Sequence, residues 1–446
     1  MHNRTTELKL KDCTELEVLR HYNKLSNKNF CIEKGFYPLG SCTMKYNPRI
    51  NERISKLEGF FDLHPNQKDE DCQGALELMY KLQDYLKIIT GMDAVCLQPC
   101  AGAQGEFLGM LIVKKYFLDK KEDRKIVLIP DSAHGTNPAS ASMCNFEVIE
   151  VKSDEKGLVN IAELEKLIEK YSSNIAAIMM TNPNTLGLFD NNILTISSLL
   201  HKNGSLLYYD GANFNAIMGH TNPRLMGFDI VHLNLHKTFS TPHAGGGPGA
   251  GPVCVIKELE DYLPNPRIEF SEGLYKRTYN NKKSVGRISA FYGNFNVLVK
   301  AYTYIYMLAN DLKKVSTDAV LAANYLKSSL EDYYNIPFKG ICAHEFVISN
   351  CDKKEKGVST LDIAKRLMDE NIHPATVYFP LIVKEAFMVE PTESETKEVL
   401  DNFINVMIKI AKEIEKGEDF SIYPKKTPVK KVDEVQAARK PDLKEC

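Results

Sequence analysis

Long apolar runs are missing from this sequence of 446 residues. None approaches the roughly 20 consecutive apolar residues that a bilayer-spanning helix needs, so we expect no membrane partner. Residues 1–7 contain no apolar stretch of the kind found in secretory signals, and the acidic residues that follow disfavour an amphipathic presequence. These absences predict a cytoplasmic protein.

A net charge of one sign is also missing. The 56 Lys and Arg residues nearly balance the 58 Asp and Glu residues, which leaves a net charge of −2 at pH 7. Such a chain has no basic field that would recruit nucleic acid. Its 43% apolar and 26% charged residues are ordinary for a soluble globular protein. Its length predicts two or three packed units rather than one core.

The 11 cysteines lack C-x-x-C spacing. The closest pair, Cys96 and Cys100, is followed by no His or second Cys pair at the spacing of a zinc site. We therefore expect reduced thiols, several of them buried as small apolar side chains, and neither a disulfide framework nor a metal site.

The pattern along the chain predicts three regions, which are 1–73, 74–300 and 301–446. The first is an N-terminal arm with a polar helix near 8–27 and an ordered loop over 35–48. The second alternates short apolar runs with helical segments. Its predicted strands are 94–97, 125–129, 146–151, 176–181, 206–210 and 230–233, and its helices are 74–90, 105–115, 161–171 and 193–203.

Strands that alternate with helices of ten or more residues indicate an α/β fold with a mainly parallel sheet covered on both faces. After about residue 300 the pattern changes to that of a smaller C-terminal α+β domain with a polar tail. Its predicted helices are 297–312, 318–334 and 395–416, and its predicted strands are 338–349 and 374–383.

In parallel sheets ligands bind at the carboxyl ends of the strands, so the residues after each strand carry the functional prediction. Gly102, Ala103 and Gln104 precede a helix, where free backbone N–H groups and the helix dipole can hold a phosphate. An ordinary strand-to-helix turn explains this segment equally well. Neither a dinucleotide fingerprint nor a P-loop is present, which disfavours a nucleotide-binding module.

Other strand ends place polar groups at the same edge of the sheet. His134 could stack on a flat ligand or move protons, although a surface turn also explains it. Thr181 and Asn213 add a hydroxyl and an amide. Asp210 ends a buried strand, which is costly unless its carboxylate meets a cation or donors, or caps the next helix.

Lys237 lies among hydroxyl groups, His236 and His243, and five glycines follow it within fourteen residues. Desolvation lowers the pKa of a lysine and makes it nucleophilic, so Lys237 is a candidate Schiff-base former rather than a surface charge. A lysine, an acid for a pyridine nitrogen, a histidine for ring stacking and a phosphate-holding helix start are the parts that pyridoxal phosphate requires.

Long motifs over nearly the whole chain resemble the glycine cleavage system P-protein family, and specifically the second subunit of its two-chain form. They are residues 39–45, 102–106, 133–139, 210–213, 236–239, 242–243 with the glycines that follow, 290–294, and 373–374 through 390–393. Departures are small: Ala244 replaces a frequent Gly, and Cys100 and Gln104 stand where Ala and His are common.

This resemblance implies the fold-type I architecture of PLP-dependent transferases, with a central sheet of the seven-stranded type. It implies that Lys237 carries pyridoxal 5'-phosphate as an aldimine, that Asp210 pairs with the pyridine nitrogen, and that His134 stacks on the ring. The other implied positions are Gly102, Ala103, Gln104 and Thr241 at the phosphate, Thr181 and Asn213 beside the ring, and His236 and His243 near the reacting atoms.

The activity implied by the resemblance is that of a PLP-dependent oxidoreductase, glycine dehydrogenase (aminomethyl-transferring). Such an enzyme decarboxylates glycine, releases CO2 and transfers the aminomethyl group to the lipoyl group of the H-protein. The implied partner is P-protein subunit 1 in an α2β2 heterotetramer. Two alternatives stay open: another fold-type I PLP enzyme that acts on a small amino acid without a lipoyl carrier, such as an aldolase or decarboxylase, and a non-catalytic scaffold subunit.

Overall fold

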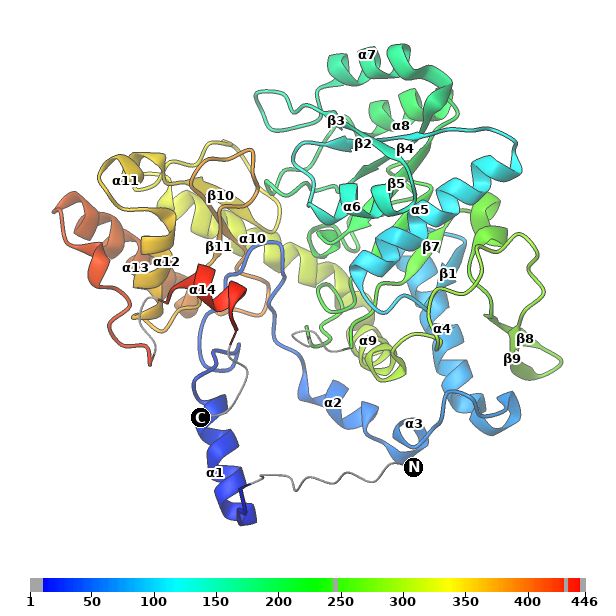
Figure 1. The fold of residues 1–446 in the computed structure, drawn as a ribbon, viewed down its shortest axis with the longest axis horizontal. Coiled ribbons are helices and arrows are strands. Elements are labelled where there is room, and N and C mark those ends of the chain that lie inside the picture. Colours follow the sequence, from blue (N-terminus) through cyan, green and yellow to red (C-terminus); the bar gives the residue numbers. More distant parts are fainter. Residues whose placement is uncertain (1–10, 244–247, 429–431, 442–446) are drawn as a thin grey trace.

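The computed structural model describes residues 11–243, 248–428 and 432–441. Its centre is a seven-stranded sheet in the order β1-β7-β6-β5-β4-β2-β3 (Figure 1). The strands are β1 (Ala94–Cys96), β2 (Ile126–Pro130), β3 (Glu147–Val151), β4 (Ile175–Met180), β5 (Leu206–Gly211), β6 (Ile230–Leu233) and β7 (Val253–Val255). Neighbours from β3 through β6 pair in parallel, whereas β7 is antiparallel to both β6 and β1. The predicted mainly parallel α/β sheet is confirmed.

Strand β7 was not expected from the sequence. It is only three residues long and follows a glycine-rich segment, so no apolar pattern long enough to predict a strand is present. All three residues are buried, and the strand fills the space between β6 and β1. The other six strands of the sheet coincide with the predicted apolar runs within one or two residues at each end.

The helices of the large region are α4 (Gln73–Thr90), α5 (Gly102–Asp119), α6 (Thr136–Met143), α7 (Ile161–Tyr171) and α8 (Ile193–Lys202). Helix α5 packs across β4, β5, β6 and β7. Its glycines permit this close approach, because a Cβ atom on Gly109 would lie 2.1 Å from Tyr208 Cε2, and one on Gly105 would lie 2.7 Å from the Gly251 carbonyl oxygen. The helix begins three residues earlier than predicted, which places Gly102, Ala103 and Gln104 in its first turn.

The C-terminal part contains a second, antiparallel sheet in the order β10-β12-β11. Its strands are β10 (Phe346–Ser349), β11 (Thr376–Val377) and β12 (Ala386–Val389), and its helices are α10 (Leu312–Leu330), α11 (Cys351–Glu355), α12 (Thr360–Met368), α13 (Lys397–Glu415) and α14 (Glu434–Arg439). Helix α9 (Phe295–Leu308) precedes them, packs on α4 and buries its apolar residues in the core of the large region. Helix α13 buries Leu400, Phe403, Met407, Ile410 and Ile414, at the three- and four-residue spacing of one helix face. The division of the chain at 73 and 300 stays a prediction.

Two predicted strands in this part are largely wrong. Residues 338–345 form turns around Gly340, and only the last four residues of the predicted 338–349 strand pair in a sheet. The 374–383 segment contributes only β11, because the chain leaves the extended conformation at Tyr378, whose φ is 59°. Strand β12, helix α12 and the hairpin of β8 (Arg267–Ser271) and β9 (Leu274–Thr278) were missed.

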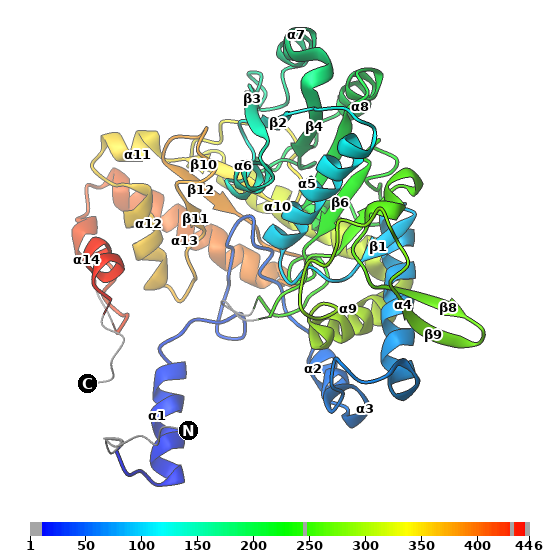
Figure 2. The ribbon, with the colours of Figure 1, turned by 45° about the vertical axis from the view of Figure 1, so that its right-hand side comes forward.

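The N-terminal arm contains α1 (Glu15–Ser26), α2 (Arg49–Ser55) and α3 (Glu58–Phe61). Helix α1 begins at a capping box formed by Thr14 and Glu17, buries no residue, and stands away from the rest of the molecule in both views (Figures 1 and 2). Of the predicted 8–27 helix, residues 8–10 lie outside the described part. The ordered loop over 35–48 is confirmed, and its Phe36 packs into the C-terminal core.

None of the helices within the described residues has the length and apolar content needed to cross a membrane. The ten cysteines in the same ranges are free thiols.

Candidate active site

A cavity of about 280 Å³ lies where β5 and β6 end and α5 begins. All of the predicted site residues line it except Gln104 and Thr241. A larger hollow of about 760 Å³, lined in part by Phe189 and Phe338, contains none of them. The strand-end loops therefore converge on one small, polar cavity.

Asp210, at the end of β5, is buried and well supplied with donors. Its Oδ2 accepts from Asn137 Nδ2 at 2.8 Å, its Oδ1 accepts from the Ala212 N–H at 2.9 Å, and His232 Nε2 lies 3.4 Å from Oδ1. Burial alone would raise the pKa of Asp210, but His232 and then the Asn137 and Ala212 donors outweigh burial and lower it. Asp210 is therefore an ionised carboxylate at neutral pH.

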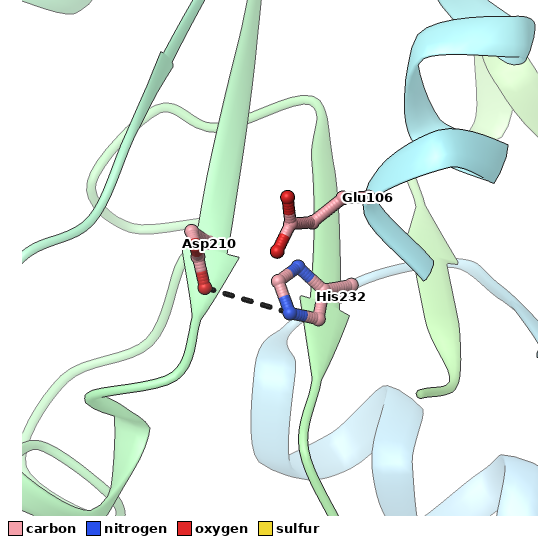
Figure 3. A group of neighbouring side chains, drawn as sticks. All are labelled: Glu106, Asp210 and His232. Atoms are coloured by element: carbon pink, nitrogen blue, oxygen red, sulfur yellow. Dashed lines mark ion pairs between the residues drawn. The ribbon is translucent and has the colours of Figure 1, made fainter. Parts of the chain in front are cut away.

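Glu106 and His232 complete a buried cluster with Asp210. Figure 3 shows their side chains meeting from α5, β5 and β6, and Asp210 and His232 are register partners on neighbouring strands. Burial, and then the charge of Asp210, raise the pKa of Glu106 to about 8. Glu106 accepts hydrogen bonds from Thr136 Oγ1 and Ser140 Oγ at 2.8 and 3.2 Å. The cluster thus holds one ionised and one neutral acid at pH 7.

His232 is fixed by two partners. Tyr208 Oη lies 2.6 Å from its Nδ1, and Asn234 Oδ1 lies 2.8 Å from its Nε2. Burial lowers its pKa, so the ring is neutral. Since Asn234 Oδ1 can only accept, the ring proton sits on Nε2, the nitrogen that faces Asp210.

The first turn of α5 offers backbone N–H groups to the cavity. The Gly105 N–H makes the first intrahelical bond, to the Ala101 carbonyl, so the N–H groups of Gly102, Ala103 and Gln104 have no intrahelical acceptor. A Cβ on Gly102 would lie 2.3 Å from Asn234 Nδ2, so a side chain there would displace the Asn234 amide. This turn is a ready anion site.

The Gln104 side chain points elsewhere. Its Oε1 accepts from the Cys100 N–H at 2.6 Å, and its Nε2 donates to the Ile288 carbonyl at 3.1 Å. These two hydrogen bonds fix the loop before α5. The side chain is therefore not available to a ligand in the cavity, and Gln104 contributes only its backbone N–H to the first turn.

Lys237 follows β6 in a turn whose backbone N–H donates to the Asn234 carbonyl. Its side chain lines the cavity, and no acid among the described residues forms an ion pair with it. The rings of His236 and His243 lie edge to face beside it, with centroids 5.2 Å apart. Burial first, and then neighbouring positive charge, lower the pKa of His236 to about 3 and that of His243 to about 4. Both rings are neutral at pH 7.

His134 lies at the mouth of the cavity. The Thr136 N–H donates to its Nδ1 at 3.2 Å, which places the proton of the neutral ring on Nε2. Its ring packs edge to face on Phe379 at 5.4 Å. Burial and then the charge of Lys237 lower its pKa. Thr136 Oγ1 also donates to Glu106, so Thr136 links His134 to the buried acids.

The remaining predicted residues take different places. Thr181 Oγ1 donates to the Pro183 carbonyl at 3.0 Å, and Asn213 Nδ2 donates to the carbonyls of Pro183 and Asn184 at 3.1 Å each. Thr241 is buried outside the cavity lining. Ala244 and the glycines directly after it lie outside the described residues.

Sequence reasoning missed Glu106, Asn137 and His232 as site residues. Glu106 and Asn137 lie in motifs 102–106 and 133–139, which carry the family resemblance, so the sequence contained the information needed to find them. His232 faces the cavity only because β6 aligns it with Asp210, and no local pattern contains that information.

Solved structures with this architecture define the class of protein. The chain superposes on a structure described as "glycine decarboxylase (P-protein) of the glycine cleavage system, in inhibitor-bound form" with a TM-score of 0.77 and 16% identity, over 91% of this chain and 92% of that one. A NifS-like protein from Rickettsia africae gives 0.63 at 16% identity, over 85% and 99%. The fold is that of the fold-type I PLP-dependent enzymes, as predicted.

Sequence comparison defines the family. The profile described as "Glycine cleavage system P-protein" matches residues 2–276, and "Glycine dehydrogenase, C-terminal domain" matches 315–433. A probable glycine dehydrogenase (decarboxylating) subunit 2 of Listeria innocua is 54% identical over 445 residues, 99% of this chain and 90% of the relative. One of Desulforamulus reducens is 55% identical over 442 residues, 98% and 91%. This chain belongs to the glycine cleavage system P-protein family, among its second subunits, and the predicted resemblance is confirmed.

Proposed function

We propose that this chain is the lysine-bearing subunit of a glycine decarboxylase, which releases CO2 and passes the aminomethyl group to the lipoyl group of the H-protein. The observation that carries the proposal is the meeting in one cavity of Lys237, ionised Asp210 and the open first turn of α5. Membership of the P-protein family supports glycine as the substrate.

The described residues fit pyridoxal phosphate. Glycine at 102 leaves room for a phosphate against three free N–H groups, and a side chain there would collide with Asn234. Asp210 offers a buried negative charge to a pyridine N–H, and Lys237 offers an amine without an ion-pair partner among the described residues. When bound, pyridoxal phosphate supplies an electron-withdrawing ring that stabilises the carbanion left by loss of CO2.

The protein residues have separate tasks in this proposal. Lys237 is the residue whose amine would hold the cofactor. Asp210, fixed by Asn137 and His232, keeps its charge at the ring nitrogen without reorganising during the reaction. The neutral His134, His236 and His243 are the groups that can take or give a proton.

The charge around the substrate also suits decarboxylation. No arginine is among the described residues that line the cavity. A glycine carboxylate there would meet no guanidinium from the described residues, and a carboxylate without a bidentate partner has less to lose when it leaves as neutral CO2.

We further propose that P-protein subunit 1 completes the enzyme in an α2β2 heterotetramer. The support is the description "subunit 2" carried by the relatives. A fold-type I enzyme without a lipoyl carrier and a non-catalytic scaffold are less well supported. The first disagrees with the family match, and the second disagrees with the presence of Lys237, Asp210 and His134 in one site.

The test is exchange of labelled bicarbonate into the carboxyl group of glycine, with lipoylated H-protein, with and without subunit 1. We expect exchange only when this chain and subunit 1 are both present with the H-protein. We expect no exchange with Lys237→Ala. Lys257→Ala is the matched control, because the Lys257 side chain is 76% exposed, and it should keep full exchange. Failure of exchange with pyridoxal phosphate bound and both proteins present would contradict the proposal.

A further inference from the structure

Asn234 lies directly after β6 and has no part in the proposed chemistry so far. It is buried and lines the cavity. The two ends of its side-chain amide meet different rings: Oδ1 lies 2.8 Å from His232 Nε2, and Nδ2 lies 3.3 Å from His236 Nε2. Because an amide accepts through its oxygen and donates through its nitrogen, Asn234 joins the two rings in one defined direction.

Asp210 decides which way the amide points. Its Oδ1 lies 3.4 Å from the same His232 Nε2. An ionised carboxylate attracts an N–H and repels a nitrogen lone pair, so His232 carries its proton on Nε2 and donates to Asn234 Oδ1. Tyr208 Oη, 2.6 Å from Nδ1, donates to the nitrogen that carries no proton. A reversed amide would point its N–H groups at the His232 proton, so the network admits one orientation of Asn234.

The other end of the amide then determines the state of His236. Asn234 Nδ2 donates to His236 Nε2, so this nitrogen carries no proton, and the proton of the neutral ring sits on Nδ1. His236 Nδ1 is buried and makes no hydrogen bond to a described residue. The contact with Asn234 is therefore the one that decides between the two forms of the ring. A neutral histidine in water favours the form with the proton on Nε2, so the site holds His236 in its less favoured form.

We propose that Asn234 is a positioning residue, which transmits the orientation of the Asp210–His232 pair to His236 and holds the His236 proton on Nδ1. While Asn234 donates to Nε2, His236 can give a proton from Nδ1 but cannot take one at Nε2. This consequence for catalysis deepens the proposed function and rests on it, whereas the hydrogen-bonded chain itself does not.

A change of one amide atom separates this role from packing. Asn234→Asp keeps the shape of the side chain but offers an acceptor at both ends. The contact with His232 survives, whereas His236 must carry a proton on Nε2 to keep its own contact. Asn402→Asp is the matched control, because Asn402 is exposed on α13.

The direct readout is nuclear magnetic resonance of the ring nitrogens in the cofactor-loaded chain, labelled with ¹⁵N-histidine. The two nitrogens of a neutral ring have well-separated shifts that show which one carries the proton. The signals are identified by their loss in His232→Gln and His236→Gln. We expect the proton on Nε2 of His232 and on Nδ1 of His236 in the wild type and in Asn402→Asp, and a proton on Nε2 of His236 in Asn234→Asp.

A proton on Nε2 of His236 in the wild type overturns the proposal, and so does an unchanged His236 signal in Asn234→Asp. The wild-type spectrum decides even if the variant fails to fold. His134 is the internal reference, since the Thr136 N–H donates to its Nδ1 and its proton should stay on Nε2 throughout.

Glycine–bicarbonate exchange measures the catalytic consequence. It is run at saturating pyridoxal phosphate, because Asn234 Nδ2 lies against the first turn of α5 and a carboxylate there would repel a phosphate. We expect at least a tenfold loss in Asn234→Asp and none in Asn402→Asp. Full exchange in Asn234→Asp would overturn the positioning role. Absence of exchange in the wild type would instead count against the proposed function, and the resonance measurement would still decide the state of His236.

Discussion

The Asn137 amide donates a 2.8 Å hydrogen bond to Asp210 Oδ2, and this contact joins the first turn of α6 to the end of β5. Neither residue is close to the other in sequence, and both are buried. Together with His232, whose influence is larger, the bond holds the pKa of the Asp210 carboxyl below its usual value, although burial acts to raise it. The negative charge that the proposed chemistry needs is therefore a product of the fold.

Removing that charge should slow the reaction without unfolding the protein. Asp210→Asn keeps the shape of the side chain but loses the charge at the cofactor nitrogen, so we expect kcat to fall by about 10²–10³, the size typical of one preorganised electrostatic contact. Steady-state exchange kinetics measure this. Asp261→Asn, at a carboxylate that is 63% exposed, is the matched control and should change nothing. Equal kcat for Asp210→Asn and the wild type would refute the role of Asp210.

The first turn of α5 gives a prediction about cofactor affinity. Gly102→Ala would place a Cβ 2.3 Å from Asn234 Nδ2 and disturb the phosphate turn, so the Kd for pyridoxal phosphate should rise at least tenfold. Gly74→Ala is the control, since it lies near the start of α4 with open space around it and should be neutral or stabilise by up to about 1 kcal/mol. Unchanged cofactor affinity in Gly102→Ala would mean that the phosphate binds elsewhere.

A buried ion pair holds the N-terminal loop. Lys45 Nζ lies 2.8 Å from Glu393 Oε1 and also donates to Asn215 Oδ1 at 2.9 Å. Lys45→Met leaves Glu393 buried without its cation, so we expect a loss of about 3–5 kcal/mol in the free energy of unfolding from denaturant titration. Lys397→Met breaks an exposed pair with Asp401 and should leave the free energy of unfolding nearly unchanged. Similar losses for the two variants would contradict this reading of the loop.

The buried acids predict that stability falls as pH rises. The pKa of Glu106 is raised to about 8 and that of Glu390 to about 7, so between their unfolded values near 4.5 and these folded values the native chain binds more protons than the unfolded chain. Stability from these acids is therefore complete below about pH 4.5 and is lost as pH rises to about 8. His236 and His243, with lowered pKa values, act oppositely, but only below their unfolded value near 6.5.

Between pH 7 and 9 the buried acids lose their protons, whereas His236 and His243 are already neutral. Melting temperatures measured over this range therefore report on the acids. We expect a steady decrease in the wild type and a shallower one in Glu106→Gln, whereas Glu258→Gln, at an exposed position, should follow the wild type. A wild-type melting temperature that rises over this range would show that these acids are ionised in the folded chain.

Local patterns in the sequence were enough for the parallel sheet and for most of one wall of the site. Parallel strands bring their carboxyl ends to one edge, so Asp210, Thr181 and Lys237 could be grouped before any coordinates. Strand β7 and the true extent of β10 were missed, because the glycine-rich segment before the first and the turns around Gly340 before the second obscure their periodicity.

The part of the lining that comes from the N-terminal arm could not be found in this way. Ser41 lines the cavity and its N–H donates to Glu345 in the C-terminal part, and only tertiary packing brings these segments together. Gln104 illustrates a subtler limit. It lies in the first turn of α5, but the choice of its amide between a ligand and the backbone of Cys100 and Ile288 depends on side-chain geometry.

The central claim is that Lys237 carries the cofactor, and chemical trapping tests it most directly. The chain is loaded with pyridoxal phosphate, reduced with borohydride, digested and mapped by mass spectrometry. The account predicts one pyridoxyl-modified peptide, with the group on Lys237, and none in Lys237→Ala, while Lys257→Ala stays labelled. A label on another lysine in the wild type, or a label that survives in Lys237→Ala, would contradict it.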